Sequence, residues 1–250
     1  MSRSVLLGVL LSVALATGAT AASGPGIAPD HLWIMVSPDA PERAALERTG
    51  FQISKDVNHH AGTGTSSITV EFENTYLELM WPDPKVPVAP GLERASEKYH
   101  QRQLWRTSGW CPIGVGFRRT TPSKEPLPLP TWTWTADWMP KGSVMEMLTP
   151  RDDTRSPALF IEPLLLSDPM GQAARAAIYH HPIGVRRITA IRLVSPKTYE
   201  PIAALTYLEQ QQHLLRVGKG DEWVVELTFD DGKQEKSKDL RPDLPLVIRY

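Results

Sequence analysis

The sequence predicts an α+β protein built mainly from antiparallel β-sheet, and three observations lead to this fold class. Short runs of alternating apolar and polar residues, typical of half-buried strands, recur along the chain. The 23 prolines among 250 residues exceed the usual share and favour ordered loops over long helices. Hydrophobic residues make up 41% of the chain, which is enough to fill a core.

The first 22 residues predict a signal peptide. Arg3 gives this segment a positive start, residues 5–16 form an apolar stretch, and small residues follow at 19–21. The apolar stretch is too short to favour a membrane anchor, although an uncleaved anchor is the alternative. We therefore expect a periplasmic or secreted protein with no stable membrane span after cleavage.

The next part of the chain predicts the element order β-α-β-β-β. A helix is expected over residues 37–50, because it can end at Gly50 in the left-handed conformation that glycine adopts easily. The polar, glycine-containing residues 58–66 predict a loop. Strands are expected at 30–36, 51–53, 68–72 and 76–80.

The rest of the chain predicts two further groups of strands. The middle group lacks a clear first helix, whereas a helix followed by strands returns in the last third. In the middle we expect a helix over 92–106 and strands at 113–118, 131–135, 144–148 and 159–162. In the last third we expect a helix over 201–208 and strands at 187–194, 214–217, 223–229 and 246–250.

Charge, cysteine content and missing motifs narrow the function. The net charge is −1, so no strong field attracts nucleic acid, and we expect no nucleic-acid partner. Cys111 is the single cysteine, so an intrachain disulfide is impossible and we expect the thiol to be buried. Motifs of nucleophile-elbow hydrolases, nucleotide-binding loops, HExxH zinc proteases and CxxC sites are missing from the sequence.

Short motifs in a fixed order carry a resemblance to a known family. They are Asp-His-Leu-Trp at 30–33, Gly-Phe at 50–51, His-Ala-Gly-Thr-Gly-Thr at 60–65, Asn-Thr-Tyr-Leu-Glu-Leu at 74–79, Phe-Ile-Glu-Pro at 160–163 and His-Pro-Ile-Gly-Val at 181–185. Together they resemble glyoxalase-like domains of the vicinal-oxygen-chelate (glyoxalase/bleomycin resistance/dioxygenase) superfamily. Ala61 stands where that family usually has proline, and Ile183 stands in place of asparagine.

This resemblance implies a particular architecture. Paired βαβββ modules would form curved, mostly antiparallel sheets around a central cavity. Residues 28–165 would be the paired-module region, and residues 182–250 would be a C-terminal βαββ-type module that completes the fold.

The resemblance also implies a divalent metal ion held by His31, Glu78 and Glu162, with Glu78 and Glu162 as the catalytic residues. One imidazole with carboxylates suits such an ion and leaves positions open for two oxygen atoms of a substrate. The second module opens with Trp-Cys-Pro at 110–112, where a second histidine would be expected. A fourth protein ligand is therefore not evident.

Further residues are expected around the same cavity. The pocket candidates are His60, Gly62, Gly64, Thr65, Tyr76 and His181. A group of tryptophans would pack in the sheet core or, if partly open, suit an apolar or aromatic ligand. They are Trp105, Trp110, Trp132, Trp134 and Trp138.

Three functions remain open on the sequence. The first is a metal-dependent lyase, isomerase or dioxygenase that acts on a small molecule. The second is a metal-free protein that binds a small molecule in the same cavity. The third is an envelope interaction protein with a collapsed pocket, and a homodimer is compatible with each of them.

Overall fold

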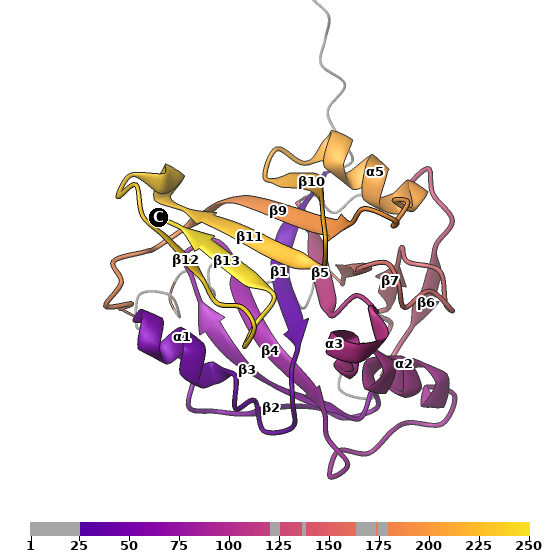
Figure 1. Ribbon diagram of the computed structural model, residues 1–250. Coiled ribbons are helices and arrows are strands. Elements are labelled where there is room, and N and C mark those ends of the chain that lie inside the picture. Colours follow the sequence, from indigo (N-terminus) through magenta and orange to yellow (C-terminus); the bar gives the residue numbers. More distant parts are fainter. Residues whose placement is uncertain (1–25, 121–125, 137–138, 164–173, 175–179) are drawn as a thin grey trace, which may run out of the picture.

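The structure is a computed structural model that describes residues 26–120, 126–136, 139–163, 174 and 180–250. The expected signal peptide lies outside these described residues. The larger of two curved sheets contains eight strands (Figure 1). In chain order they are β1 (Ile27–Met35), β2 (Asn58–His60), β3 (Thr65–Glu71), β4 (Tyr76–Pro82), β5 (Ile113–Arg119), β6 (Trp132–Trp134), β7 (Met145–Met147) and β8 (Ala158–Glu162).

The smaller sheet comes from the last part of the chain. Its strands are β9 (Ile188–Pro196), β10 (Leu215–Gly220), β11 (Val224–Phe229), β12 (Ser237–Asp239) and β13 (Leu246–Arg249). The described helices are α1 (Arg43–Thr49), α2 (Glu93–Gln103), α3 (Trp105–Ser108) and α5 (Ala203–Gln211), with a 3₁₀ turn, η1 (Asp230–Gly232). None of these helices is long and apolar enough to span a bilayer.

The larger sheet consists of two similar halves, as its strand order β2-β3-β4-β1-β5-β8-β7-β6 shows. In each half the first and last strands pair in parallel, β1 with β4 and β5 with β8. The halves join where β1 and β5 pair antiparallel. The predicted α+β class with curved sheets is confirmed, and α1 belongs to the first half, whereas the described residues of the second half contain no corresponding helix.

Side chains along β1 point alternately to the two faces of the larger sheet. Leu32 and Ile34 belong to the main core, whereas Trp33 and Met35 belong to a smaller cluster. Successive side chains on a strand point to opposite faces of the sheet. The two clusters therefore lie on opposite faces of the larger sheet.

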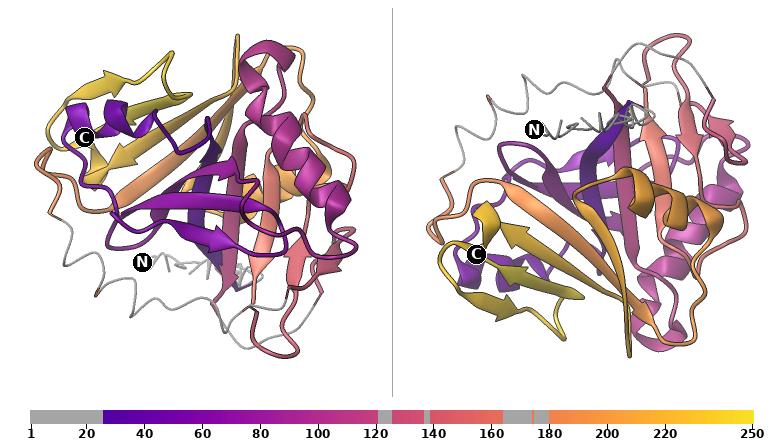
Figure 2. Two further views of the ribbon diagram at one scale, coloured as in Figure 1. Left: turned by 90° about the horizontal axis from the view of Figure 1, so that it is seen from below. Right: turned by 90° about the horizontal axis from the view of Figure 1, so that it is seen from above.

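The smaller sheet packs against the core face of the larger one. Figures 1 and 2 show its strands, coloured orange to yellow, lying across that face. Phe229 of β11 packs against Phe72, with ring centroids 4.9 Å apart, and both side chains belong to the same core cluster. The opposite face remains available for a site.

Two predicted elements differ from the structure. Residues 51–53 form no strand. Phe51 and Ile53 are buried in the core, but this segment does not pair with a neighbouring strand. Residues 58–60 were expected in a loop, but they pair with residues 65–67 of β3. The apolar pattern at 51–53 thus indicates burial in the core and not pairing with another strand.

Cys111 lies just before β5 and is completely buried in the core. Burial raises the pKa of its thiol to about 12. A thiol with such a pKa stays protonated at neutral pH and is a poor nucleophile or metal ligand.

Candidate functional site

A cavity of about 250 Å³ lies on the face of the larger sheet that the smaller sheet leaves free. Three central strands point alternate side chains into it, as the period of two in a strand requires. The lining residues from β1, β4 and β8 are His31, Trp33, Tyr76, Glu78, Met80, Ala158, Phe160 and Glu162.

Two glycines of β5 make room for the large side chains of β1. A Cβ atom placed on Gly116 would lie 2.7 Å from Cε1 of His31, and one on Gly114 would lie 1.9 Å from Cε2 of Trp33. Neither distance is sterically possible. The rings of His31 and Trp33 therefore lie directly over the backbone of the neighbouring strand.

Asp30, His31 and Glu162 form a compact polar cluster, and one potential ligand atom from each lies within 4.8 Å of the others. Nδ1 of His31 is 3.1 Å from Oδ2 of Asp30 and 3.8 Å from Oε1 of Glu162. Neighbours in a regular strand would point to opposite faces. The pairing of β1 with β5 shifts between Pro29 and His31, and this bulge is the irregularity that accompanies the contact between Asp30 and His31.

Arg118 of β5 completes the surroundings of Asp30. Its Nη1 donates hydrogen bonds to Oδ1 of Asp30 at 3.2 Å and to the carbonyl oxygen of Pro29 at 3.0 Å. Burial raises the pKa of Asp30, but His31 and Arg118 outweigh burial and lower it. Asp30 is therefore a carboxylate at neutral pH.

The cluster also shifts the proton affinities of His31 and Glu162. Burial lowers the pKa of His31, but the carboxylates of Glu162, Asp30 and Glu78 raise it to about 9. Burial raises the pKa of Glu162 to about 7, and His31 opposes this rise in part. Without a bound cation, Glu162 therefore exchanges its proton close to neutral pH.

Aromatic rings fix the orientation of His31. The ring of Tyr76 stacks on it, with centroids 4.6 Å apart and planes 11° apart. The ring of Phe160 meets it edge-on at 5.4 Å. The imidazole is thus held between two rings and the polar cluster.

Glu78 lies in the same cavity, and its Oε1 accepts a hydrogen bond of 3.2 Å from the hydroxyl of Ser67. The sequence named His31, Glu78 and Glu162 as metal ligands, and the structure places all three side chains around one cavity. The three residues whose potential ligand atoms lie within 4.8 Å of one another are Asp30, His31 and Glu162. This group contains Asp30 in place of Glu78.

The other predicted pocket residues fall into three groups. His60, Thr65 and Tyr76 line the cavity, and Nδ1 of His60 lies 3.0 Å from Oγ1 of Thr65. Gly62 and Gly64 shape the turn between β2 and β3, both with positive φ. His181 is not among the lining residues.

His181 instead packs in the core, beside the rings of Phe51 and Phe72 at 5.5 and 5.1 Å. Its Nδ1 accepts a hydrogen bond from the backbone N–H of Gln52, and its Nε2 donates one to the carbonyl oxygen of Glu71. This neutral imidazole connects three segments of the chain.

Sequence reasoning missed Asp30 as a site residue, although it named Asp30 in a motif. The available signal was Pro29, because proline inside a central strand marks a bulge. The family resemblance also led us to expect a second histidine near Cys111. The residue of β5 that pairs with His31 is instead Gly116. The second half therefore contributes space at this position instead of a ligand.

Comparisons with known proteins give a family and a fold for the chain. A family model described as a glyoxalase-like domain matches residues 30–208. Among solved structures, the chain is similar to the crystal structure of a hypothetical protein from Staphylococcus aureus, with a TM-score of 0.52 and 9% sequence identity over 90% of this chain and 98% of that one. At this identity the likeness concerns the fold alone, and no curated protein matches.

Proposed function

Because the chain belongs to the family of glyoxalase-like domains, we propose that it is a divalent-metal-dependent enzyme acting on a small molecule. The observation that carries this proposal is the cluster of Asp30, His31 and Glu162, of which His31 and Glu162 line the cavity. The reaction classes that suit it are those of lyases, isomerases and dioxygenases, as the sequence resemblance implied.

The charges of the site fit a divalent cation. Asp30, Glu78 and Glu162 are three carboxylates that are buried or nearly so and act on the imidazole of His31. Arg118 forms an ion pair with Asp30. Buried carboxylates need a cationic partner, and a divalent ion could fill this role in place of the proton of His31. One imidazole and two carboxylates suit a borderline or hard divalent ion and leave coordination positions for substrate oxygen atoms.

A bound divalent ion would supply a Lewis acid that stabilises negative charge on a substrate oxygen. Glu78 lies outside the group of three and faces the same space, so we assign it the transfer of a proton to or from the substrate. The hydroxyl of Ser67 orients this carboxylate. Trp33, Met80 and Phe160 give the cavity an apolar lining that limits access of water.

Metal analysis of purified protein tests the proposal. After incubation with Mn²⁺, Ni²⁺ or Zn²⁺ and removal of excess ions, we expect one tightly held ion per chain in the wild type and in the control Glu226→Gln, whose carboxylate lies in the smaller sheet. Glu162→Gln should weaken binding by at least about tenfold. Absence of binding in the wild type, or equal binding in Glu162→Gln, would contradict the proposal.

A comparison of two variants decides which carboxylate is the third ligand. If Asp30 is the ligand, Asp30→Asn should lose the ion, whereas Glu78→Gln should retain it. The reverse result would favour the set of His31, Glu78 and Glu162 that the sequence named.

A metal-free binding protein is the second candidate, and one observation favours it. The imidazole of His31 already lies between the carboxylates of Asp30 and Glu162, and its pKa of about 9 makes it a cation at neutral pH. In this case a small ligand should raise the melting temperature equally with and without EDTA. A shift that disappears in EDTA would favour the enzyme.

We also propose that the protein is exported to the periplasm or secreted. The segment of residues 1–22 supports this, since it has the composition of a signal peptide. Sequencing the amino terminus of protein recovered from the periplasm and medium tests it, and a start at residue 22 or 23 is expected. Light scattering of the same material tests the homodimer.

A further inference from the structure

A second hollow adjoins the cavity. This outer cleft has a volume of about 290 Å³. It shares part of its wall with the cavity, so the two spaces are neighbours. The shared lining residues are Thr63, Tyr99, Trp134, Met147 and Ala158.

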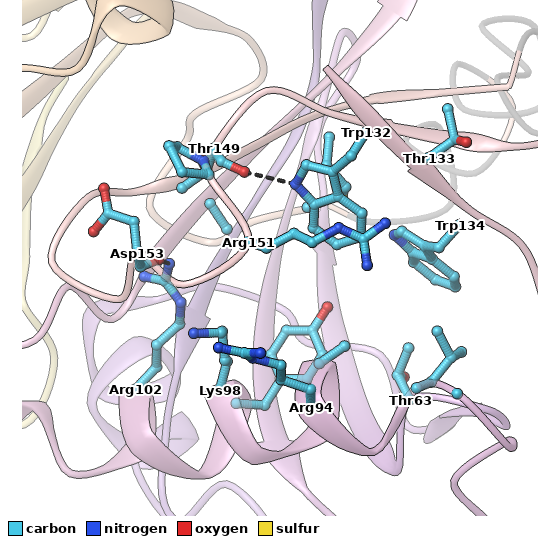
Figure 3. A pocket seen from close by; sticks show the side chains of 17 residues that line it. Thr63, Arg94, Lys98, Arg102, Trp132, Thr133, Trp134, Thr149, Arg151 and Asp153 are labelled. Atoms are coloured by element: carbon cyan, nitrogen blue, oxygen red, sulfur yellow. Dashed lines mark hydrogen bonds between the residues drawn. The ribbon is translucent and has the colours of Figure 1, made fainter. Parts of the chain in front are cut away.

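Cationic side chains dominate the polar part of the outer cleft. Arg94, Lys98 and Arg102 come from α2, and Arg151 comes from the loop after β7. Figure 3 shows Arg94 and Lys98 extending from the helix toward the space that Arg151 faces from the other side. These four cations face one acidic lining residue, Asp153.

The carboxylates near the cleft leave much of this positive charge available. Asp153 opposes the four positive charges with a single negative charge, and its carboxylate accepts hydrogen bonds from the backbone N–H groups of Arg155 and Ser156 and from the Ser156 hydroxyl. Asp152 pairs with Arg94 and Lys98, but its side chain is 64% exposed, so water screens these pairs strongly.

Arg102 places a buried positive charge at the wall of the cleft. Arg102 is 4% exposed, and its guanidinium donates hydrogen bonds to the carbonyl oxygens of Cys111, Ser156 and Asp153. These carbonyl partners orient the group but carry no formal charge, and the nearby carboxylate of Asp153 offsets only part of its field. An anion entering the cleft would therefore meet a fixed positive field in a partly desolvated place.

Aromatic rings stand beside these cations. The guanidinium carbon of Arg151 lies 4.4 Å from the ring centroid of Trp132, whose indole nitrogen donates a hydrogen bond to the carbonyl oxygen of Thr149. Among the described residues, Arg151 has this ring contact and no carboxylate partner. Trp134 belongs to the wall that the outer cleft shares with the cavity.

We propose that the ligand is an organic anion with a flat apolar body. Its acidic group would bind between Arg151 and Lys98, its body would lie against Trp134 and Met147, and its other end would reach the cluster of Asp30, His31 and Glu162. This inference deepens the proposed function, because it names the class of small molecule that the site takes.

Two fluorescent probes that differ only in charge test the proposal. 8-Anilinonaphthalene-1-sulfonate is an anion with a flat, apolar naphthalene body, and N-phenyl-1-naphthylamine is the same molecule without the sulfonate. We expect the wild type to bind the anion more tightly, and we expect added salt to reduce this preference because ions screen the attraction.

Substitutions assign the preference to the outer cleft. Arg151→Gln and Lys98→Met should each weaken binding of the anionic probe about tenfold and change binding of the neutral probe less than about twofold. Arg155→Gln is the matched control, because Arg155 is an exposed arginine of the same loop that does not line the cleft. Trp134→Ala should weaken binding of both probes.

Several results would overturn the inference. They are equal affinity of the wild type for both probes, equal loss of both probes in Arg151→Gln, or a loss in Arg155→Gln as large as in Arg151→Gln. Near-ultraviolet circular dichroism verifies that each variant keeps its tertiary structure. Because probe binding is measured in EDTA, failure of the metal proposal leaves this result readable, and metal binding by Arg151→Gln is measured separately.

Discussion

Gly116 shows how one missing side chain can determine a site. The ring of His31 lies where a Cβ atom on Gly116 would be, and Phe160 also comes within 2.9 Å of that position. Gly116→Ala should therefore displace the imidazole, reduce metal binding and lower the free energy of unfolding by about 1–3 kcal/mol.

The matched control for this substitution is Gly218→Ala in β10. There the added carbon meets the flexible end of Arg192, so we expect a smaller loss of stability and normal metal binding. Metal titration and urea unfolding of both variants check the prediction. Normal metal binding by Gly116→Ala would show that the position of the ring is not important.

At the scale of residues, the sequence indicated which side chains line the cavity better than it indicated their contacts. His31, Glu78 and Glu162 were named from motifs, and all three line one cavity. The contact between His31 and Asp30 depends on a bulge in the pairing with β5, a strand that lies more than 80 positions away in the chain. Local sequence patterns contain little information about such a long-range shift in register.

At the scale of elements, His181 fastens the loop before β9 to the end of β3. Burial lowers its pKa below the usual value, and the hydrogen bond to the carbonyl of Glu71 opposes this in part. The unfolded chain therefore takes up a proton first as the pH falls. This contribution to stability is present above about pH 6.5 and is lost as the pH falls from there through the lowered pKa.

A variant that does not titrate isolates this effect. The difference in unfolding free energy between the wild type and His181→Gln should shrink as the pH falls from 7.5 to 5, because only the wild type loses the contribution of a neutral imidazole. Urea titrations at several pH values measure this difference. A difference that stays constant with pH would show that His181 does not titrate in this range.

Most elements were predictable because alternation and turn residues are local signals. Residues 76–80 and 113–118 alternate clearly, and both lie within strands of the structure. The exposed strand β12 was missed, since Ser237, Lys238 and Asp239 have no apolar side to reveal their pairing. The strand predicted at 51–53 was wrong for the opposite reason, because the apolar residues of this segment are buried without a partner strand.

At the scale of the whole molecule, the two sheets share one core and should unfold together. Phe229 lies in the smaller sheet and packs against Phe51 and Phe72, which belong to the first half of the chain. Phe229→Ala should lower the free energy of unfolding by about 3–5 kcal/mol. Tryptophan fluorescence and far-ultraviolet circular dichroism should still give coincident transitions, and separate transitions would mean that the sheets are independent units.

The arrangement of the sheets was only partly predictable. The resemblance implied paired modules, and the strand order of the larger sheet agrees with two similar halves. Nothing in the local pattern showed which face the smaller sheet would cover. That choice depends on the combined apolar surfaces of both sheets, which exist only after the strands have paired.

The segment that connects the two halves of the larger sheet has a further consequence. Helix α2 lies in this connecting segment, contacts β4 and supplies one side of the outer cleft. A change in the length or composition of this segment would alter the shape of the outer cleft and leave the strand pairing of both sheets unchanged. One scaffold could in this way serve chemically unrelated molecules through the exchange of a single connecting helix.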